Sequence, residues 1–154
     1  MVNKIKVRKA VIVAAGWGTR FLPATKSVPK EMLPLLDKPI IQYSVDEILD
    51  SGIEQIIIVT AKDKQPVKDY FSPSQELERF LGQKGESELL RKIRKPQGSA
   101  VISYVEQEEK LGLGHAVLMA KDAVGDEPFA VLLPDDIIKS ETSALKQMMA
   151  VFNE

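Results

Sequence analysis

Residues 10–34 read AVIVAAGWGTRFLPATKSVPKEMLP, and this stretch is the most informative part of the sequence for both fold and function. Its first part, 10–15, is a short run rich in Val and Ile that ends at Gly16, which predicts a buried strand. Glycines such as Gly16 and Gly18 let the backbone approach a ligand, and amides in such a turn can point at anionic oxygens. Three cations follow within the same stretch: Arg20, Lys26 and Lys30. The stretch therefore predicts a strand followed by a phosphate-binding loop.

The rest of the chain alternates short apolar runs with segments of helical periodicity. The predicted strands are Val7–Ala15, Ile53–Thr60, Ala100–Val105 and Glu127–Leu133. The predicted helices are Pro39–Ser51, Asp63–Phe71, Pro73–Lys84 with Ser72 as its cap, Glu86–Lys95, Gly114–Val124 and Ser143–Phe152. Three prolines keep Phe21–Lys38 irregular. The alternation predicts an α/β fold, a Rossmann-like, mostly parallel sheet with flanking helices.

Polar and glycine-rich segments follow several of the predicted strands. Parallel sheets bind ligands beyond the carboxyl ends of their strands. The glycine loop, Gln107–Gly114 and the pair Asp135-Asp136 all lie near such ends. We therefore expect them to gather at one edge of the sheet.

The composition excludes several classes of function. The chain has 154 residues, 44% hydrophobic and 28% charged, which is typical of one soluble globular domain. A net charge of −1 argues against a nucleic-acid partner, and no segment approaches the ~18 apolar residues of a membrane span. Cysteine is absent, which excludes disulfides and zinc–thiolate sites and suits a cytoplasmic protein.

The glycine loop matches neither of two common phosphate loops. A P-loop ends in Gly-Lys-Ser/Thr, which residues 16–20 lack. A dinucleotide loop needs a third glycine where Phe21 stands and an immediate helix, which Pro23 interrupts. The second predicted strand also ends in Thr60 and Ala61 instead of an acidic residue. These features disfavour a dinucleotide-binding oxidoreductase.

The pattern that fits is A-G-x-G-T-R-x-x-P-x-T-K, followed by P-K-E-M-L-P. Three further segments accompany it: DKPIIQY at 37–43, GLGHA at 112–116 and LLPDD at 132–136. From Lys9 to Lys139 the chain resembles the sugar-phosphate nucleotidylyltransferases. The K-E-M-L-P and G-L-G-H-A segments resemble most closely the bacterial uridylyltransferases that use UTP and glucose 1-phosphate.

The resemblance implies transfer of UMP from UTP to glucose 1-phosphate, giving UDP-glucose and pyrophosphate without a covalent enzyme intermediate. Catalysis would then consist of positioning and charge neutralisation, with Arg20 and Lys30 as the catalytic residues on the phosphates. Asp135 resembles the family's Mg²⁺ ligand. The implied substrate-binding residues are Ala15, Gly16, Gly18, Thr19, Glu31, Gln107 and Gly112. Of these, Glu31 or Gln107 would accept a hydrogen bond from the uracil N–H.

Each of these residues also has an ordinary structural explanation. The glycines suit a tight turn, the cations suit an exposed surface, and Asp135 with Asp136 suits a turn. His115 is expected to be structural, and Trp17 is assigned no role. Two related functions stay open: a non-catalytic nucleotide-binding regulatory homologue, and a thymidylyltransferase acting on a related sugar 1-phosphate.

The resemblance also concerns domain organisation. The family's domain continues past residue 154, so residues 1–154 are expected to form the nucleotide-binding part of a single nucleotidyltransferase domain. The sugar-phosphate pocket and a second metal ligand would then be absent from this chain, and the chain alone would be inactive. Homo-oligomers of the full-length protein are implied by analogy.

Overall fold

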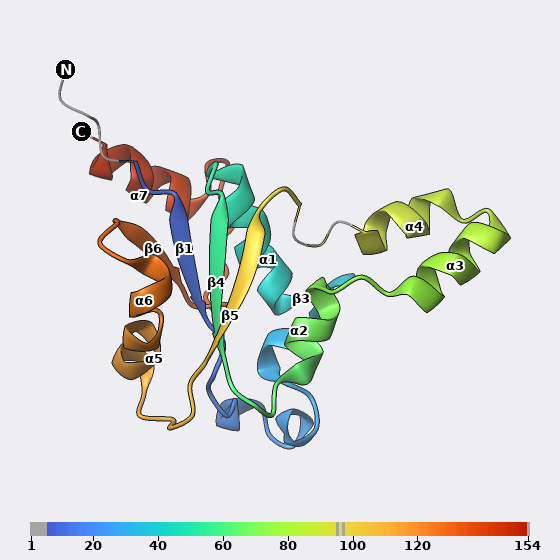
Figure 1. Cartoon of the computed structure of the whole chain (residues 1–154), viewed down its shortest axis with the longest axis horizontal. Helices are drawn as coiled ribbons and strands as arrows, with labels where there is room; N and C mark the ends of the chain where they lie inside the picture. Colours follow the sequence, from blue (N-terminus) through green and yellow to red (C-terminus); the bar gives the residue numbers. More distant parts are fainter. Residues whose placement is uncertain (1–5, 95, 97, 154) are drawn as a thin grey trace.

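The structure, a computed structural model, describes residues 6–94, 96 and 98–153. Its centre is a four-stranded sheet in the order β5-β4-β1-β6, in which every neighbouring pair is parallel (Figure 1). The strands are β1 (Lys9–Val13), β4 (Gln55–Thr60), β5 (Val101–Glu106) and β6 (Phe129–Leu132). The helices are α1 (Ile40–Asp50), α2 (Gln65–Phe71), α3 (Gln75–Lys84), α4 (Ser87–Arg94), α5 (Leu113–Met119), α6 (Lys121–Val124) and α7 (Ala144–Phe152). The predicted parallel α/β sheet is confirmed.

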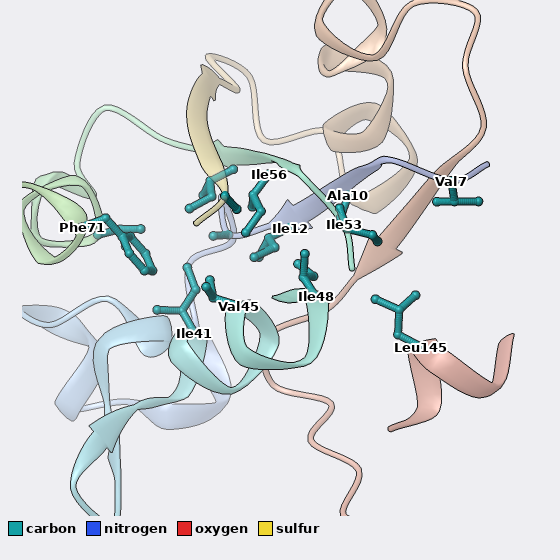
Figure 2. Close-up of a cluster of buried hydrophobic side chains, with 14 residues drawn as sticks. Val7, Ala10, Ile12, Ile41, Val45, Ile48, Ile53, Ile56, Phe71 and Leu145 are labelled. Carbon is teal, nitrogen blue, oxygen red and sulfur yellow. The ribbon is translucent and has the colours of Figure 1, made fainter. Parts of the chain in front are cut away.

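Both faces of the sheet are covered, which explains why β1 and β4 are continuous apolar runs. Side chains alternate along a strand, so Ile12 and Ile56 face one core with α1, whereas Val11 faces a second core with α5 and α6. In Figure 2, Ile12 and Ile56 lie above the α1 side chains Ile41, Val45 and Ile48. The sheet is thereby held between two helical layers.

The last helix is attached to α1 by both apolar and polar contacts. The Leu145 side chain of α7 is buried in the core beneath the sheet (Figure 2). The backbone N–H of Leu145 donates to Oε1 of Glu47 on α1 at 2.8 Å. The Ser143 side chain accepts from the N–H of Lys146, which caps the same helix end. Two of the otherwise unsatisfied amides at this helix start therefore have partners.

The segment between β1 and α1 is irregular, as predicted. It contains three short 3-10 helices, Thr19–Phe21, Ala24–Lys26 and Lys30–Met32. A small antiparallel hairpin of β2 (Pro34–Leu35) and β3 (Lys38–Pro39) then leads into α1.

Two details of the predicted helices are wrong. Ser72 does not cap α3, because it ends α2 and donates its hydroxyl to the Lys68 carbonyl at 2.8 Å. Residues 114–124 do not form one helix, since the chain bends at Ala120 between α5 and α6. The predicted end of the fourth helix, Lys95, lies outside the described residues.

The hairpin of α3 and α4 projects away from the sheet (Figure 1). Within the described ranges, none of the helices is both long and apolar enough to cross a membrane.

The packing of the sheet on α1 predicts which side chains contribute most to the stability of the fold. Replacing the fully buried Ile56 with Ala leaves a cavity, and we expect a loss of about 2–5 kcal/mol in the free energy of unfolding. Val101→Ala is the matched control, because Val101 is a strand residue that is 68% exposed. Urea denaturation measures both. Equal effects of the two substitutions would contradict the assigned core.

Candidate active site

The carboxyl ends of all four strands lie at the same edge of the sheet, because all four are parallel. β6 joins β1 on the side opposite β4, so the chain changes direction in the sheet order here, and ligands bind at such points. A pocket of about 340 Å³ opens at this edge. Its lining includes Gly16, Trp17, Arg20, Lys30, Gln107, Lys110, Gly112, Asp135 and Asp136. The predicted gathering of these segments is confirmed.

The glycine loop is held in shape by contacts with the segment that follows it. Gly18 has a φ of +67°, a left-handed conformation that favours glycine. A Cβ at this position would lie 3.1 Å from the Lys30 Cβ, and the Gly18 carbonyl accepts from the Thr25 hydroxyl at 2.8 Å. By contrast, a Cβ at Gly16 would have no neighbour within 4 Å. Gly18 therefore shapes the turn, and Gly16 leaves the pocket side open.

Two cations meet one carboxylate at the pocket. Lys30 Nζ lies 2.9 Å from Asp135 Oδ2, and Arg20 Nη2 lies 3.6 Å from the same oxygen. Partial burial acts to raise the pKa of Asp135, but the hydrogen bond and charge of Lys30, together with Arg20, outweigh it and hold this pKa below its usual range. Asp135 is therefore a carboxylate at neutral pH, and both cations are positioned at a strand end beside the glycine loop.

Gln107 is a buried, hydrogen-bonded polar side chain of the pocket. It is only 4% exposed, and its backbone N–H donates to the Thr60 carbonyl at 2.8 Å. Its amide nitrogen lies 3.2 Å from the Gly112 carbonyl and 2.9 Å from His115 Nδ1. The predicted residues Gln107 and Gly112 thus lie in direct contact. His115 orients Gln107, in agreement with the structural role expected for it.

Glu31 lies outside the pocket lining. It is 1% exposed, and its Oε2 accepts from Lys64 Nζ at 2.7 Å. Burial lowers the pKa of Lys64, and the charge and hydrogen bond of Glu31 offset part of this shift. The second oxygen, Oε1, is buried without a hydrogen-bond partner in the part of the chain that the structure describes. Glu31 therefore fixes the turn that carries Lys30.

The other predicted residues lie around the pocket in different ways. The Ala15 side chain is fully buried in the core beneath α5 and α6. Thr19 lines a neighbouring pocket of about 440 Å³, which it shares with Gly16 and Lys64. Gly18 is placed for the turn described above. Arg20, Lys30, Gly16, Gln107, Gly112 and Asp135 are the predicted residues that share the central pocket.

Sequence reasoning missed Lys110 and assigned no role to Trp17. Both line the central pocket, and Lys110 Nζ lies 3.3 Å from the centre of the Trp17 ring. Lys110 ends the polar run Glu106–Lys110, which resembles a solvated loop. Only the fold brings this loop beside the glycine loop, so no local pattern could have indicated the contact.

A parallel sheet with a glycine loop, converging cations and a carboxylate at its switch point is an α/β arrangement suited to a phosphate-bearing ligand. Residues 9–154 match the family model described as nucleotidyl transferase. The chain belongs to the nucleotidyl transferase family. Members of this family generally depend on a metal ion.

Comparison with individual proteins shows which members of the family the chain resembles. The chain is 59% identical over 144 residues to the UTP–glucose-1-phosphate uridylyltransferase of Bacillus subtilis, covering 94% of this chain and 49% of that protein. A UTP-bound UGPase from Acinetobacter baumannii is 46% identical with a TM-score of 0.92, over 96% of this chain and 53% of the other. A UDP-glucose pyrophosphorylase complexed with UDP-glucose is 43% identical with a TM-score of 0.81, over 95% and 53% of the two chains. The resemblance to uridylyltransferases is confirmed, and the chain spans about half the length of the curated relatives it matches.

The ion pair at Asp135 predicts a pH-dependent contribution to stability. A carboxylate whose pKa is lowered in the folded state stabilises the fold at pH values above its ordinary pKa of 3.8. This contribution is lost as the pH falls through the lowered pKa. We expect Asp135→Asn to reduce the free energy of unfolding at pH 7 by about 1 kcal/mol or less, as for partly exposed ion pairs. The difference from the parent should shrink below pH 3.8.

Denaturation series from pH 7 to about pH 2 measure this difference. Asp126→Asn, at an exposed residue before β6, is the matched control. A stability difference for Asp135→Asn that stays constant into acid would contradict the assigned ion pair.

Proposed function

We propose that the protein carrying this chain transfers UMP from UTP to glucose 1-phosphate, giving UDP-glucose and pyrophosphate. The observation that carries the proposal is the convergence of Lys30 and Arg20 on Asp135 beside the glycine loop. The uridylyltransferase relatives support the choice of uridine over thymidine. The same relatives are named as enzymes, which favours catalysis over a purely regulatory role.

The reaction is a phosphoryl-group substitution that needs no protein nucleophile. An oxygen of the sugar phosphate attacks the α-phosphorus of UTP, and the bond from that phosphorus to the bridging β-phosphate oxygen breaks in line. Pyrophosphate leaves with the electron pair of that bond. Negative charge grows on the leaving group, and a forked guanidinium at Arg20 and the ammonium of Lys30 are suited to neutralise it.

The base is assigned to the side of the pocket formed by Gln107 and Gly112. Because the Gln107 amide nitrogen faces Gly112 and His115, its oxygen is the group suited to accept the uracil N3–H. The amides of Gly16 and Thr19 are assigned to phosphate, together with the backbone of Ala15. Burial of Glu31 against Lys64 favours a role in holding Lys30 over the direct base contact that the sequence predicts.

Asp135 is the proposed ligand of Mg²⁺. Its partly buried carboxylate, with Asp136 in the same pocket, suits a cation that commonly uses one or two carboxylates and substrate phosphate oxygens. Such an ion would neutralise phosphate charge when bound. Within the described residues there is no cluster of three acidic, histidine or cysteine side chains. We accordingly propose that the sugar-phosphate pocket and a second metal ligand belong to the half of the relatives that this chain does not cover.

We further propose a cytoplasmic location, which the absence of cysteine supports. Homo-oligomers of the whole protein stay a prediction by analogy with the family.

A coupled pyrophosphate-release assay on the whole protein tests the proposal. With glucose 1-phosphate and Mg²⁺, we expect release from UTP to exceed release from dTTP. Lys30→Ala should lower kcat/KM by about 10²–10³-fold, the order found when one donor to developing charge is removed. The exposed Lys121 on α6 does not line the central pocket, and Lys121→Ala is the matched control.

Three results would contradict the proposal. UTP binding without pyrophosphate release would indicate a regulatory homologue. Preference for dTTP would indicate a thymidylyltransferase. An unchanged kcat/KM in Lys30→Ala would remove Lys30 from the site.

A further inference from the structure

Trp17 occupies a central place among the cavities at the carboxyl edge of the sheet. Its side chain lines the central pocket, the neighbouring pocket with Thr19, and a third cavity of about 750 Å³ beside β4 and β5. It is nevertheless 66% exposed, although a large aromatic side chain gains by burial. An exposed indole at the junction of three cavities, within a ligand-binding loop, has a face available to a ligand.

Lys110 fixes the position of this ring. Its ammonium lies 3.3 Å from the centre of the Trp17 ring and 3.4 Å from both carboxylate oxygens of Asp63. The three residues belong to three different loops, which follow β1, β4 and β5. One side of the indole is therefore covered by a cation that is itself held by a carboxylate, and cation–π contacts of this kind are attractive.

The Trp17 ring and Gln107 also share two cavities. Both residues line the central pocket and the third cavity. Gln107 is held against Gly112 and His115, so the hydrogen-bonding edge proposed for the base is fixed. A planar base that meets this edge needs an apolar surface against its face, and indole supplies such a surface.

We propose that Trp17 is a substrate-contact residue on which the uracil of UTP stacks, and that Lys110 is a positioning residue that holds the indole in place. This inference rests on the proposed function, since it assumes that UTP occupies the central pocket. Stacking acts on the base alone, whereas Arg20 and Lys30 act on the phosphates. A ring already held by Lys110 loses less freedom when the base binds.

Calorimetric titration of the whole protein with two probes, for the parent and each variant, tests this division of roles. The probes are UTP and inorganic tripolyphosphate, each with equal Mg²⁺, since tripolyphosphate has the charge but no base. We expect Trp17→Leu to weaken UTP binding by about tenfold, within the range for base–aromatic stacking. Tripolyphosphate affinity should change by less than about twofold, because phosphate contacts act separately. Trp17→Phe, the matched control, keeps an aromatic face and should recover most of the UTP affinity.

The positioning role of Lys110 is tested by measuring whether its effect on UTP binding depends on Trp17. Lys110→Met should weaken UTP binding in the parent but have no further effect in Trp17→Leu, because a positioning residue acts through the ring. Trp17 is the single tryptophan of these 154 residues. Lys110→Met should also shift the Trp17 fluorescence, taken as the difference from the same protein carrying Trp17→Leu, before any ligand is added.

Several outcomes would overturn the inference. Equal losses for UTP and tripolyphosphate, or equal affinities of Trp17→Phe and Trp17→Leu, would show that no base stacks on the ring. A further loss from Lys110→Met in the Trp17→Leu background would show that Lys110 acts elsewhere. Failure of the parent to bind UTP would overturn the proposed function as well, whereas parental UTP binding that is independent of Trp17 would overturn this inference alone.

Discussion

The parallel pairing of β1 with β4 on one side and β6 on the other determines where everything else in this protein lies. Val13 pairs with Val59 and Ile12 pairs with Leu132, so β1, β4 and β6 end at nearly the same level. The loops that follow these strand ends therefore lie together at one edge of the sheet. Because β6 lies on the opposite side of β1 from β4, the Asp135 segment leaves the sheet beside the glycine loop, and the two segments line one crevice.

Charge is arranged around that crevice before any ligand arrives. Lys30 is held from two directions: its own ammonium contacts Asp135, and the adjacent Glu31 is buried against Lys64. Removing one partner of a buried pair is costly, so the turn carrying Lys30 has little freedom. In the proposed reaction, a phosphate that enters would meet cations already in place, and preorganised charge of this kind stabilises a transition state without reorganisation cost.

The sequence predicted the sheet, the irregular segment after β1 and the meeting of the loops, because each depends on local patterns and on the rule for parallel strands. It also predicted Arg20, Lys30, Gln107 and Asp135, which the fold brings to one pocket. The burial of Glu31 could not be predicted, since its partner Lys64 is 33 positions away. The contact of Lys110 with Trp17 depends on the packing of two loops, and a single sequence carries no signal for it.

We propose that the nucleotide binds between the glycine loop and the end of β6. Backbone amide shifts of the ¹⁵N-labelled chain, recorded as UTP and Mg²⁺ are added, test this location most directly. We expect the largest shifts at residues 14–20, 30, 107–113 and 135–136, the segments around the central pocket. Shifts that instead cluster around the separate cavity between the β2–β3 hairpin and residues 137–143 would contradict it.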